Sequence, residues 1–87
     1  MYRGQLPPLY YFRDKEGHEI DILIEHNNAL FPVEIKMSVN AGLSDCKNIF
    51  YLRKKLSNVG QGAVISLAKR HMPIDRLHDL IPLGMVG

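Results

Sequence analysis

The sequence predicts an α+β domain in which three strands form an antiparallel hairpin meander, one helix packs on it, and a fourth strand follows (β-β-β-α-β). Two stretches, residues 19–25 and 30–36, alternate between apolar and polar side chains, which is typical of half-buried strands. Apolar side chains then recur at helical spacing between residues 46 and 59. A chain of 87 residues with 46% hydrophobic and 23% charged side chains suits one modest core. We therefore treat residues 1–87 as a single domain.

The first strand is expected at residues 9–13, where aromatic side chains follow Pro7 and Pro8. Residues 14–17 form a predicted turn, because Gly17 can adopt the left-handed conformation that tight turns need. After this turn the chain is expected to reverse and to enter the second strand, so that the first two strands pair side by side.

The second and third strands are predicted to pair about Asn27 and Asn28, since asparagine tolerates the positive φ of a two-residue hairpin turn. In this register one face is wholly apolar, and a slip by one residue would move these side chains to the wrong face. The opposite face places Asp21 across from Glu34. Pro32 lacks an N–H and predicts an edge or bulged position. The apolar face consists of Ile20, Ile22, Ile24, Phe31, Val33 and Ile35.

The helix is predicted at residues 45–56, with Ser44 as its N-cap. A short buried strand is expected at residues 63–67. Further along, the pattern indicates a brief helical turn at residues 75–80 and an extended segment at residues 81–86. The side chains predicted to face the sheet from the helical region are Cys46, Ile49, Leu52, Leu56 and Val59.

The opposition of Asp21 and Glu34 is the strongest functional signal. Directly opposed side chains lie about 4.5–5.5 Å apart at Cβ, where like charges destabilise a sheet. Two carboxylates at that separation can share one divalent cation, and oxygen ligands favour Mg²⁺ or Mn²⁺. Lys36 follows Glu34 by two residues on the same face, within reach of a phosphate. The pattern therefore predicts a metal-dependent phosphate site.

Asp21, followed after twelve residues by Glu34-x-Lys36, resembles the active-site motif of the PD-(D/E)XK nuclease superfamily. The resemblance implies a restriction-endonuclease-like core in which Asp21 and Glu34 hold Mg²⁺ or Mn²⁺, together with the backbone carbonyl of Ile35. It also implies catalytic roles for Asp21, Glu34 and Lys36, because the lysine of that superfamily orients the attacking water and stabilises charge at the phosphate.

Longer segments resemble the C-terminal domain of a bacterial and archaeal AAA+-type ATPase family, a domain without assigned function. The resemblance implies that the chain is part of a longer ATPase-linked protein and that an ATPase domain, in cis or in trans, is its partner. The chain has no G-x-x-x-x-G-K-[ST] loop, so it predicts no nucleotide site. Residues 1–8 contain no Asp or Glu, whereas the opening helix of the nuclease core usually supplies another acid. The segments that carry the resemblance are residues 10–14, 17–21, 31–36, 62–65, 72–74 and 81–84.

Charged residues outside the motif have two open interpretations. Glu19 is expected either to form an ion pair with Lys36 or to assist the site. Arg13 is expected beside Glu19, with either a structural role or an auxiliary role at the site. Lysines on the helix either form a solvated face or contact the DNA backbone, where they would carry no sequence information. These lysines are Lys47, Lys54 and Lys55.

Composition sets the remaining expectations. The four histidines lack HxxxH or HxH spacing, so no zinc site is predicted. The single cysteine, Cys46, has a core-facing position and indicates a reducing compartment. A net charge of +2 gives little attraction for nucleic acid, and no segment offers the ~20 apolar residues of a membrane helix. We expect a cytoplasmic protein without a membrane partner.

Two functions remain open from the sequence. The first is a Mg²⁺-dependent phosphodiesterase site, active or vestigial, that is accessory to an ATPase and acts on DNA. The second is a non-catalytic module for protein interaction or oligomerisation that uses the fold as a scaffold. Because no helix is predicted before the first strand, apolar side chains there are expected to be under-covered, and the chain is expected to form a homo-oligomer.

Overall fold

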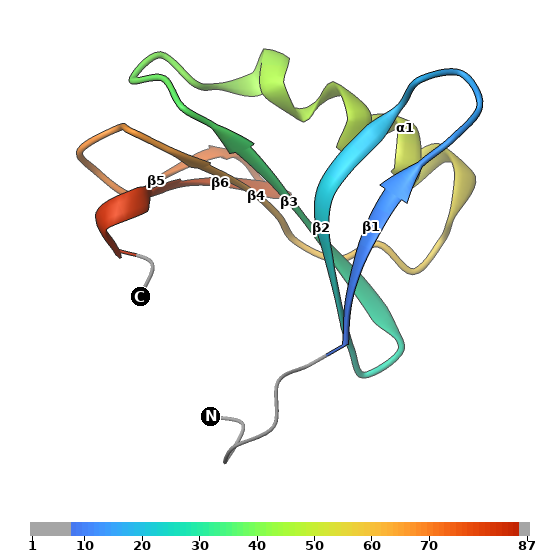
Figure 1. Ribbon diagram of the computed structural model, residues 1–87. Coiled ribbons are helices and arrows are strands. Elements are labelled where there is room, and N and C mark those ends of the chain that lie inside the picture. Colours follow the sequence, from blue (N-terminus) through green and yellow to red (C-terminus); the bar gives the residue numbers. More distant parts are fainter. Residues whose placement is uncertain (1–7, 86–87) are drawn as a thin grey trace.

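The structure is a computed structural model that describes residues 8–85. Its strands are β1 (Leu9–Arg13), β2 (Glu19–His26), β3 (Ala29–Lys36), β4 (Gly62–Ser66), β5 (Met72–Asp75) and β6 (His78–Pro82). Its helical segments are the 3₁₀ helix η1 (Leu43–Cys46), the helix α1 (Lys47–Lys55) and the 3₁₀ helix η2 (Leu83–Met85). The strands form one mixed sheet in the order β1-β2-β3-β4-β6-β5, with α1 along one side of it (Figure 1). The predicted α+β class is confirmed, and the sheet continues beyond the predicted order with β5 and β6.

The sheet has an antiparallel half and a parallel centre. β1, β2 and β3 form the predicted antiparallel meander. β3, β4 and β6 run parallel, and β5 returns antiparallel at the far edge. The chain crosses from β3 to β4 through η1 and α1, and this crossover brings the helical layer over the sheet.

The hairpin turns predicted in the first half of the chain are confirmed. Asn27 and Asn28 adopt φ angles of 52° and 65°, and Gly17 adopts a φ of 90°. These left-handed conformations match the twist of tight hairpin connections. β2 and β3 consequently pair in the predicted register, which extends as far as Ile22 opposite Val33.

An extra residue in β2 decides which side chains reach the core. Phe12 of β1 pairs with Ile20, whereas Tyr10 pairs with Leu23, so two residues of β2 face one residue of β1. Such a bulge interrupts the strict alternation of side chains between the two faces. Ile20 and Leu23, which strict alternation would place on opposite faces, therefore lie in one buried cluster with Ile49 of α1.

The helix α1 does not cover the apolar sheet face that the sequence predicts to be buried. It packs on the opposite face. Parallel pairing sets Glu34 beside Val64, which is fully buried against Cys46 of η1. Ile35, the next residue of β3, is 46% exposed. The prediction that Ile20 and Ile35 share a covered face is therefore wrong. It assumed strict alternation along β2 and placed the helix over the wholly apolar face.

The helical segment begins earlier than predicted. It starts as η1 at Leu43, so Ser44 is not its N-cap. Gly42 precedes the first turn, and its N–H donates a hydrogen bond to Asp45 Oδ2 at 2.9 Å. The Asp45 side chain reaches back to the start of its own turn in this way, as an acidic residue at the third helical position often does.

Of the core positions predicted from helical spacing, those up to Leu52 are buried, whereas Leu56, beyond the end of α1, is exposed. Cys46, Ile49 and Leu52 are buried as predicted, and Val59 packs against the cluster that holds Ile49 and Leu52. Leu56 follows the last helical residue with extended backbone angles of −128° and 142°, and it is 40% exposed. The predicted core position of Leu56 is therefore wrong, because the helical spacing no longer applies there.

Of the two positions predicted for Pro32, an edge or a bulge, the edge is wrong, because β3 is an interior strand. The pairing beside Pro32 is irregular. Leu30 bridges to Val59, whereas Val33 pairs with Ala63, so three steps along β3 correspond to four steps along the neighbouring segment. This interruption accommodates a residue that has no N–H to donate to a regular ladder.

The predicted helical turn at residues 75–80 is wrong, because the chain forms the β5–β6 hairpin there. Asp75 Oδ1 accepts a hydrogen bond from the Leu77 N–H at 2.9 Å and lies 2.7 Å from His78 Nδ1. His78 is fully buried and packs against the ring of Phe50 from α1. The turn is thus held by a side chain that the tertiary structure buries.

The remaining predicted elements differ at their bounds. The strand expected at residues 63–67 is β4, shifted by one residue. The extended segment expected at residues 81–86 is a strand only as far as Pro82, and Val86 lies outside the described residues. Among residues 8–85, no helix has both the length and the apolar character that a membrane span requires.

Candidate metal centre

Asp21 and Glu34 meet where the backbone pairing of β2 and β3 ends. The Asp21 N–H donates to Glu34 Oε1 at 3.1 Å, and the Ile35 N–H donates to Asp21 Oδ2 at 2.8 Å. The last regular pair before them joins Ile22 to Val33. Each carboxylate is therefore held by a backbone N–H of the other strand, and the two acids that the predicted register opposes lie side by side.

The bulge in β2 accounts for this arrangement. Asp21 is one of its two residues, so the regular ladder is interrupted at this point. The side chains of Asp21 and Glu34 then accept the N–H groups that backbone carbonyls would accept in a regular sheet. Bulges re-aim side chains in this manner and are common next to functional sites.

Glu34 occupies an environment that disfavours its negative charge. Its pKa is raised from 4.5 to about 7. Burial is the largest cause, and the charges of Asp21, Asp45 and Glu19 act in the same direction, whereas the hydrogen bond from the Asp21 N–H offsets part of the effect. A divalent cation would favour the charged form. The donor set of two neighbouring carboxylates therefore fits Mg²⁺ or Mn²⁺.

A pocket of about 210 Å³ lies between the end of β3 and the start of the helical segment. Within its lining, Lys36 Nζ lies 3.8 Å from Asp45 Oδ1. The nuclease motif implies four site residues, and three of them, Glu34, Ile35 and Lys36, line this pocket. The fourth, Asp21, is linked by hydrogen bonds to Glu34 and Ile35. The lining residues are Glu34, Ile35, Lys36, Ser44, Asp45, Lys47 and Asn48.

Asp45 is the candidate residue that the sequence did not reveal. The sequence places it only at the start of the predicted helix. In the structure the crossover that leaves β3 returns η1 to the end of that strand, and Asp45 reaches the pocket with 18% of its side chain exposed. No spacing along the chain signals this return, because the connection between Lys36 and η1 has no regular structure.

Glu19 forms an ion pair with Arg13, so the predicted place of Arg13 beside Glu19 is confirmed. Arg13 Nε lies 3.6 Å from Glu19 Oε1, and the Tyr11 hydroxyl donates to the same carboxylate oxygen. The expected pair between Glu19 and Lys36 is wrong, because Lys36 turns toward Asp45. The Arg13 and Glu19 side chains are largely exposed, so their pair contributes about 0–1 kcal/mol.

The three lysines predicted as DNA contacts do not converge. Lys47 begins α1 and lines the pocket, whereas Lys54 and Lys55 stand at the other end of the same helix. Lys55 Nζ lies 5.3 Å from the centre of the Tyr51 ring, within the range of a cation–π contact. Of these three lysines, only Lys47 is therefore placed to contact a ligand of the pocket.

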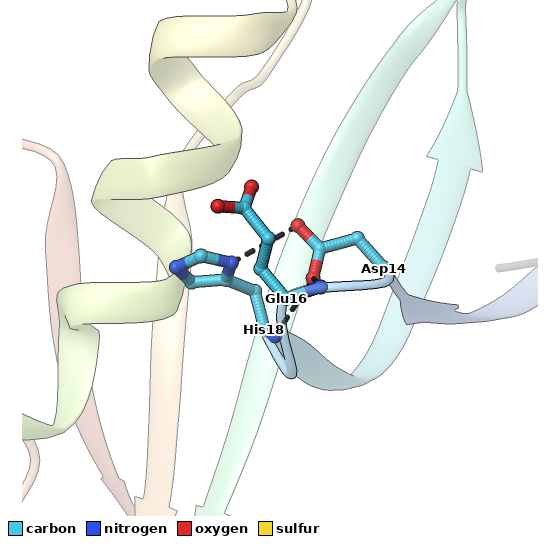
Figure 2. A group of neighbouring side chains, drawn as sticks. All are labelled: Asp14, Glu16 and His18. Atoms are coloured by element: carbon cyan, nitrogen blue, oxygen red, sulfur yellow. Dashed lines mark hydrogen bonds and ion pairs between the residues drawn. The ribbon is translucent and has the colours of Figure 1, made fainter.

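Figure 2 shows a second group of potential ligands, Asp14, Glu16 and His18, whose ligand atoms lie within 4.8 Å of one another. Asp14 Oδ1 accepts the N–H groups of Glu16 and His18 at 3.0 and 2.9 Å, and Asp14 Oδ2 lies 3.0 Å from His18 Nδ1. The His18 ring stacks on Tyr51 of α1 at a centroid distance of 3.6 Å. This group closes the β1–β2 turn and docks it on the helix.

The raised pKa of Glu34 predicts a specific pH dependence of stability. Between pH 4.5 and about 7 the folded chain binds more protons at Glu34 than the unfolded chain does, so stability falls as the pH rises through this window. We expect a loss on the order of 1 kcal/mol, after allowance for solvent screening of a partly exposed side chain. Glu34→Gln should not show this loss in urea unfolding from pH 4 to 8, and parallel pH profiles would contradict the assignment.

The model of a family described as a domain of unknown function (DUF4143) matches residues 1–86. No curated protein and no solved structure matches significantly. Because the family match spans almost the whole chain, the protein belongs to the DUF4143 family.

Proposed function

We propose that the chain is a cytoplasmic nuclease-like domain with a PD-(D/E)XK-type phosphodiesterase site, in which Asp21, Glu34 and the backbone carbonyl of Ile35 bind one Mg²⁺ or Mn²⁺. One observation carries the proposal: two carboxylates meet at the end of the β2–β3 pairing, and one of them, Glu34, is partly buried beside further acids. Opposed like charges cost stability, so a structural role alone would favour another residue pair.

In this proposal, the residues around the pocket have different functions. When bound, the cation would stabilise negative charge at a phosphate and activate a water. Asp21 and Glu34 supply the negative charge that holds the cation, and the N–H groups of the neighbouring strands keep both carboxylates oriented. Lys36 lines the same pocket and can donate hydrogen bonds to a phosphate oxygen.

The proposed site is accessory to an AAA+-type ATPase. Support comes from the resemblance of several segments, including residues 10–14, 17–21 and 31–36, to the C-terminal domain of such proteins. The chain contains no phosphate-binding loop of the G-x-x-x-x-G-K-[ST] type, so ATP hydrolysis would belong to a separate domain. An ATPase partner would also deliver substrate, for which the net charge of +2 provides little attraction.

The first test is calorimetric titration of the chain with Mn²⁺. We expect saturable binding by the wild type and a loss of at least about tenfold in affinity in Asp21→Asn and in Glu34→Gln, because each removes one charged ligand. Glu25→Gln is the matched control, since it removes the same charge from β2 at a position outside the pocket. Equal affinities in all four proteins would contradict the proposed metal site.

The second test is cleavage of labelled single- and double-stranded DNA with Mg²⁺ or Mn²⁺. We expect no robust turnover by the 87-residue chain alone, because the proposed site holds the cation with two carboxylates and one backbone carbonyl, and a cation with few fixed ligands is less well oriented. A misplacement of ~1 Å costs on the order of 100-fold in rate. Cleavage that Lys36→Ala abolishes would overturn this expectation and establish an active nuclease.

A second candidate function, self-association, is favoured by the sheet face that α1 leaves open. Ile35 is 46% exposed on this face, and further isoleucines of neighbouring strands are only partly buried beside it. A continuous apolar face of this kind is typical of interaction surfaces. The partly buried members are Ile22, Ile24, Ile65 and Ile81.

Size-exclusion chromatography with light scattering tests this second function. We expect a dimer or a larger species for the wild type and a shift toward monomer in Ile35→Gln, which places a polar group on the open face. Leu56→Gln is the control, because Leu56 is similarly exposed, at 40%, but follows the helix. A monomeric wild type at high concentration would exclude an oligomerisation module.

A further inference from the structure

The Lys36 ammonium lies beside Asp45 and not beside Glu34, the acidic residue nearest to it along β3. Lys36 and Glu34 lie two residues apart on β3 and therefore project from the same face of the strand. Among residues 8–85, no Lys, Arg or His forms an ion pair with Glu34, although a lysine side chain is long enough to reach it. The Lys36 ammonium nevertheless lies beside Asp45, with 3.8 Å between Nζ and Oδ1. Asp45 therefore competes with Glu34 for the Lys36 ammonium group.

Hydrogen bonds to the backbone hold the Asp45 side chain in place. Its Oδ2 accepts the Gly42 N–H at 2.9 Å, and its own N–H donates to the Gly42 carbonyl at 3.0 Å. Its side chain is 18% exposed, whereas that of Lys36 is 54% exposed. The backbone therefore orients the carboxylate of Asp45, and Lys36 is the more exposed partner of the pair.

We propose that Asp45 is a positioning residue that holds the Lys36 ammonium away from Glu34 and so keeps the Glu34 carboxylate open to a divalent cation. This inference rests on the proposed metal site of Asp21 and Glu34 and adds the residue that keeps it accessible. Without Asp45, Lys36 would turn to Glu34 and neutralise the ligand internally. The ion pair with Asp45 also keeps the Lys36 ammonium in the pocket, where it could contact a phosphate.

A double-mutant cycle tests the proposal with Mn²⁺ titration as its readout. Asp45→Asn keeps an oxygen that can accept the Gly42 N–H, and Lys36→Met keeps the length of the side chain without its charge. In the wild-type background Asp45→Asn should weaken Mn²⁺ binding by about tenfold, and in the Lys36→Met background by about threefold at most. The smaller loss is the general effect of removing one negative charge.

Asp79→Asn provides the matched control for that general effect. It removes the same charge from β6, outside the lining of the pocket, and should change Mn²⁺ affinity by less than about threefold. Equal losses on Asp45→Asn with and without Lys36 would overturn the proposal, because Asp45 would then act on the cation directly. A loss no larger than that of Asp79→Asn would overturn it as well.

A crystal structure of Asp45→Asn without metal gives a readout that does not depend on cation binding. We expect Lys36 Nζ within about 4 Å of a Glu34 carboxylate oxygen, the usual limit of an ion pair. A Lys36 side chain that extends into solvent would overturn the positioning role. If the wild type failed to bind Mn²⁺, the proposed metal site would be wrong, and this structure alone would decide whether Asp45 holds Lys36 away from Glu34.

Discussion

The bulge in β2 is the constraint on which both the core and the candidate site depend. It turns Ile20 and Leu23 toward the same buried cluster under α1. It also ends the regular pairing of β2 and β3, so that the carboxylates of Asp21 and Glu34 accept backbone N–H groups. Hydrogen bonds to charged groups contribute about 1.5–3 kcal/mol each, which offsets the repulsion between two neighbouring acids.

The covered face of the sheet carries the core and the candidate site together. Val64 is fully buried, and Glu34 is its neighbour on β3. This closeness to the core explains why burial is the largest cause of the raised pKa of Glu34. A partly buried carboxylate beside further acids works against stability, and such local conflicts are typical of functional sites. The remainder of the face is conventional, with apolar side chains from η1, α1 and the central strands.

Elements with local signals could be predicted, and elements that depend on distant contacts could not. The β2–β3 hairpin follows from alternation and from two asparagines that tolerate positive φ. The β5–β6 hairpin could not be predicted, because its turn is held by His78, whose burial against Phe50 exists only in the folded chain. Leu56 has the correct helical spacing but lies beyond the end of α1, a boundary that periodicity does not reveal.

That Asp21 and Glu34 are neighbours across the hairpin could be derived from the order of residues, because the register depends on a turn and on an alternating pattern within 13 residues, whereas the hydrogen bonds of their carboxylates to backbone N–H groups depend on the bulge in β2. The place of Lys36 on the same side as Glu34 follows from the same alternation. Which face α1 covers, and that Asp45 lies beside Lys36, are consequences of the path of the crossover between β3 and β4. Local patterns do not encode that path, since the packing of the helical layer against the whole sheet selects it.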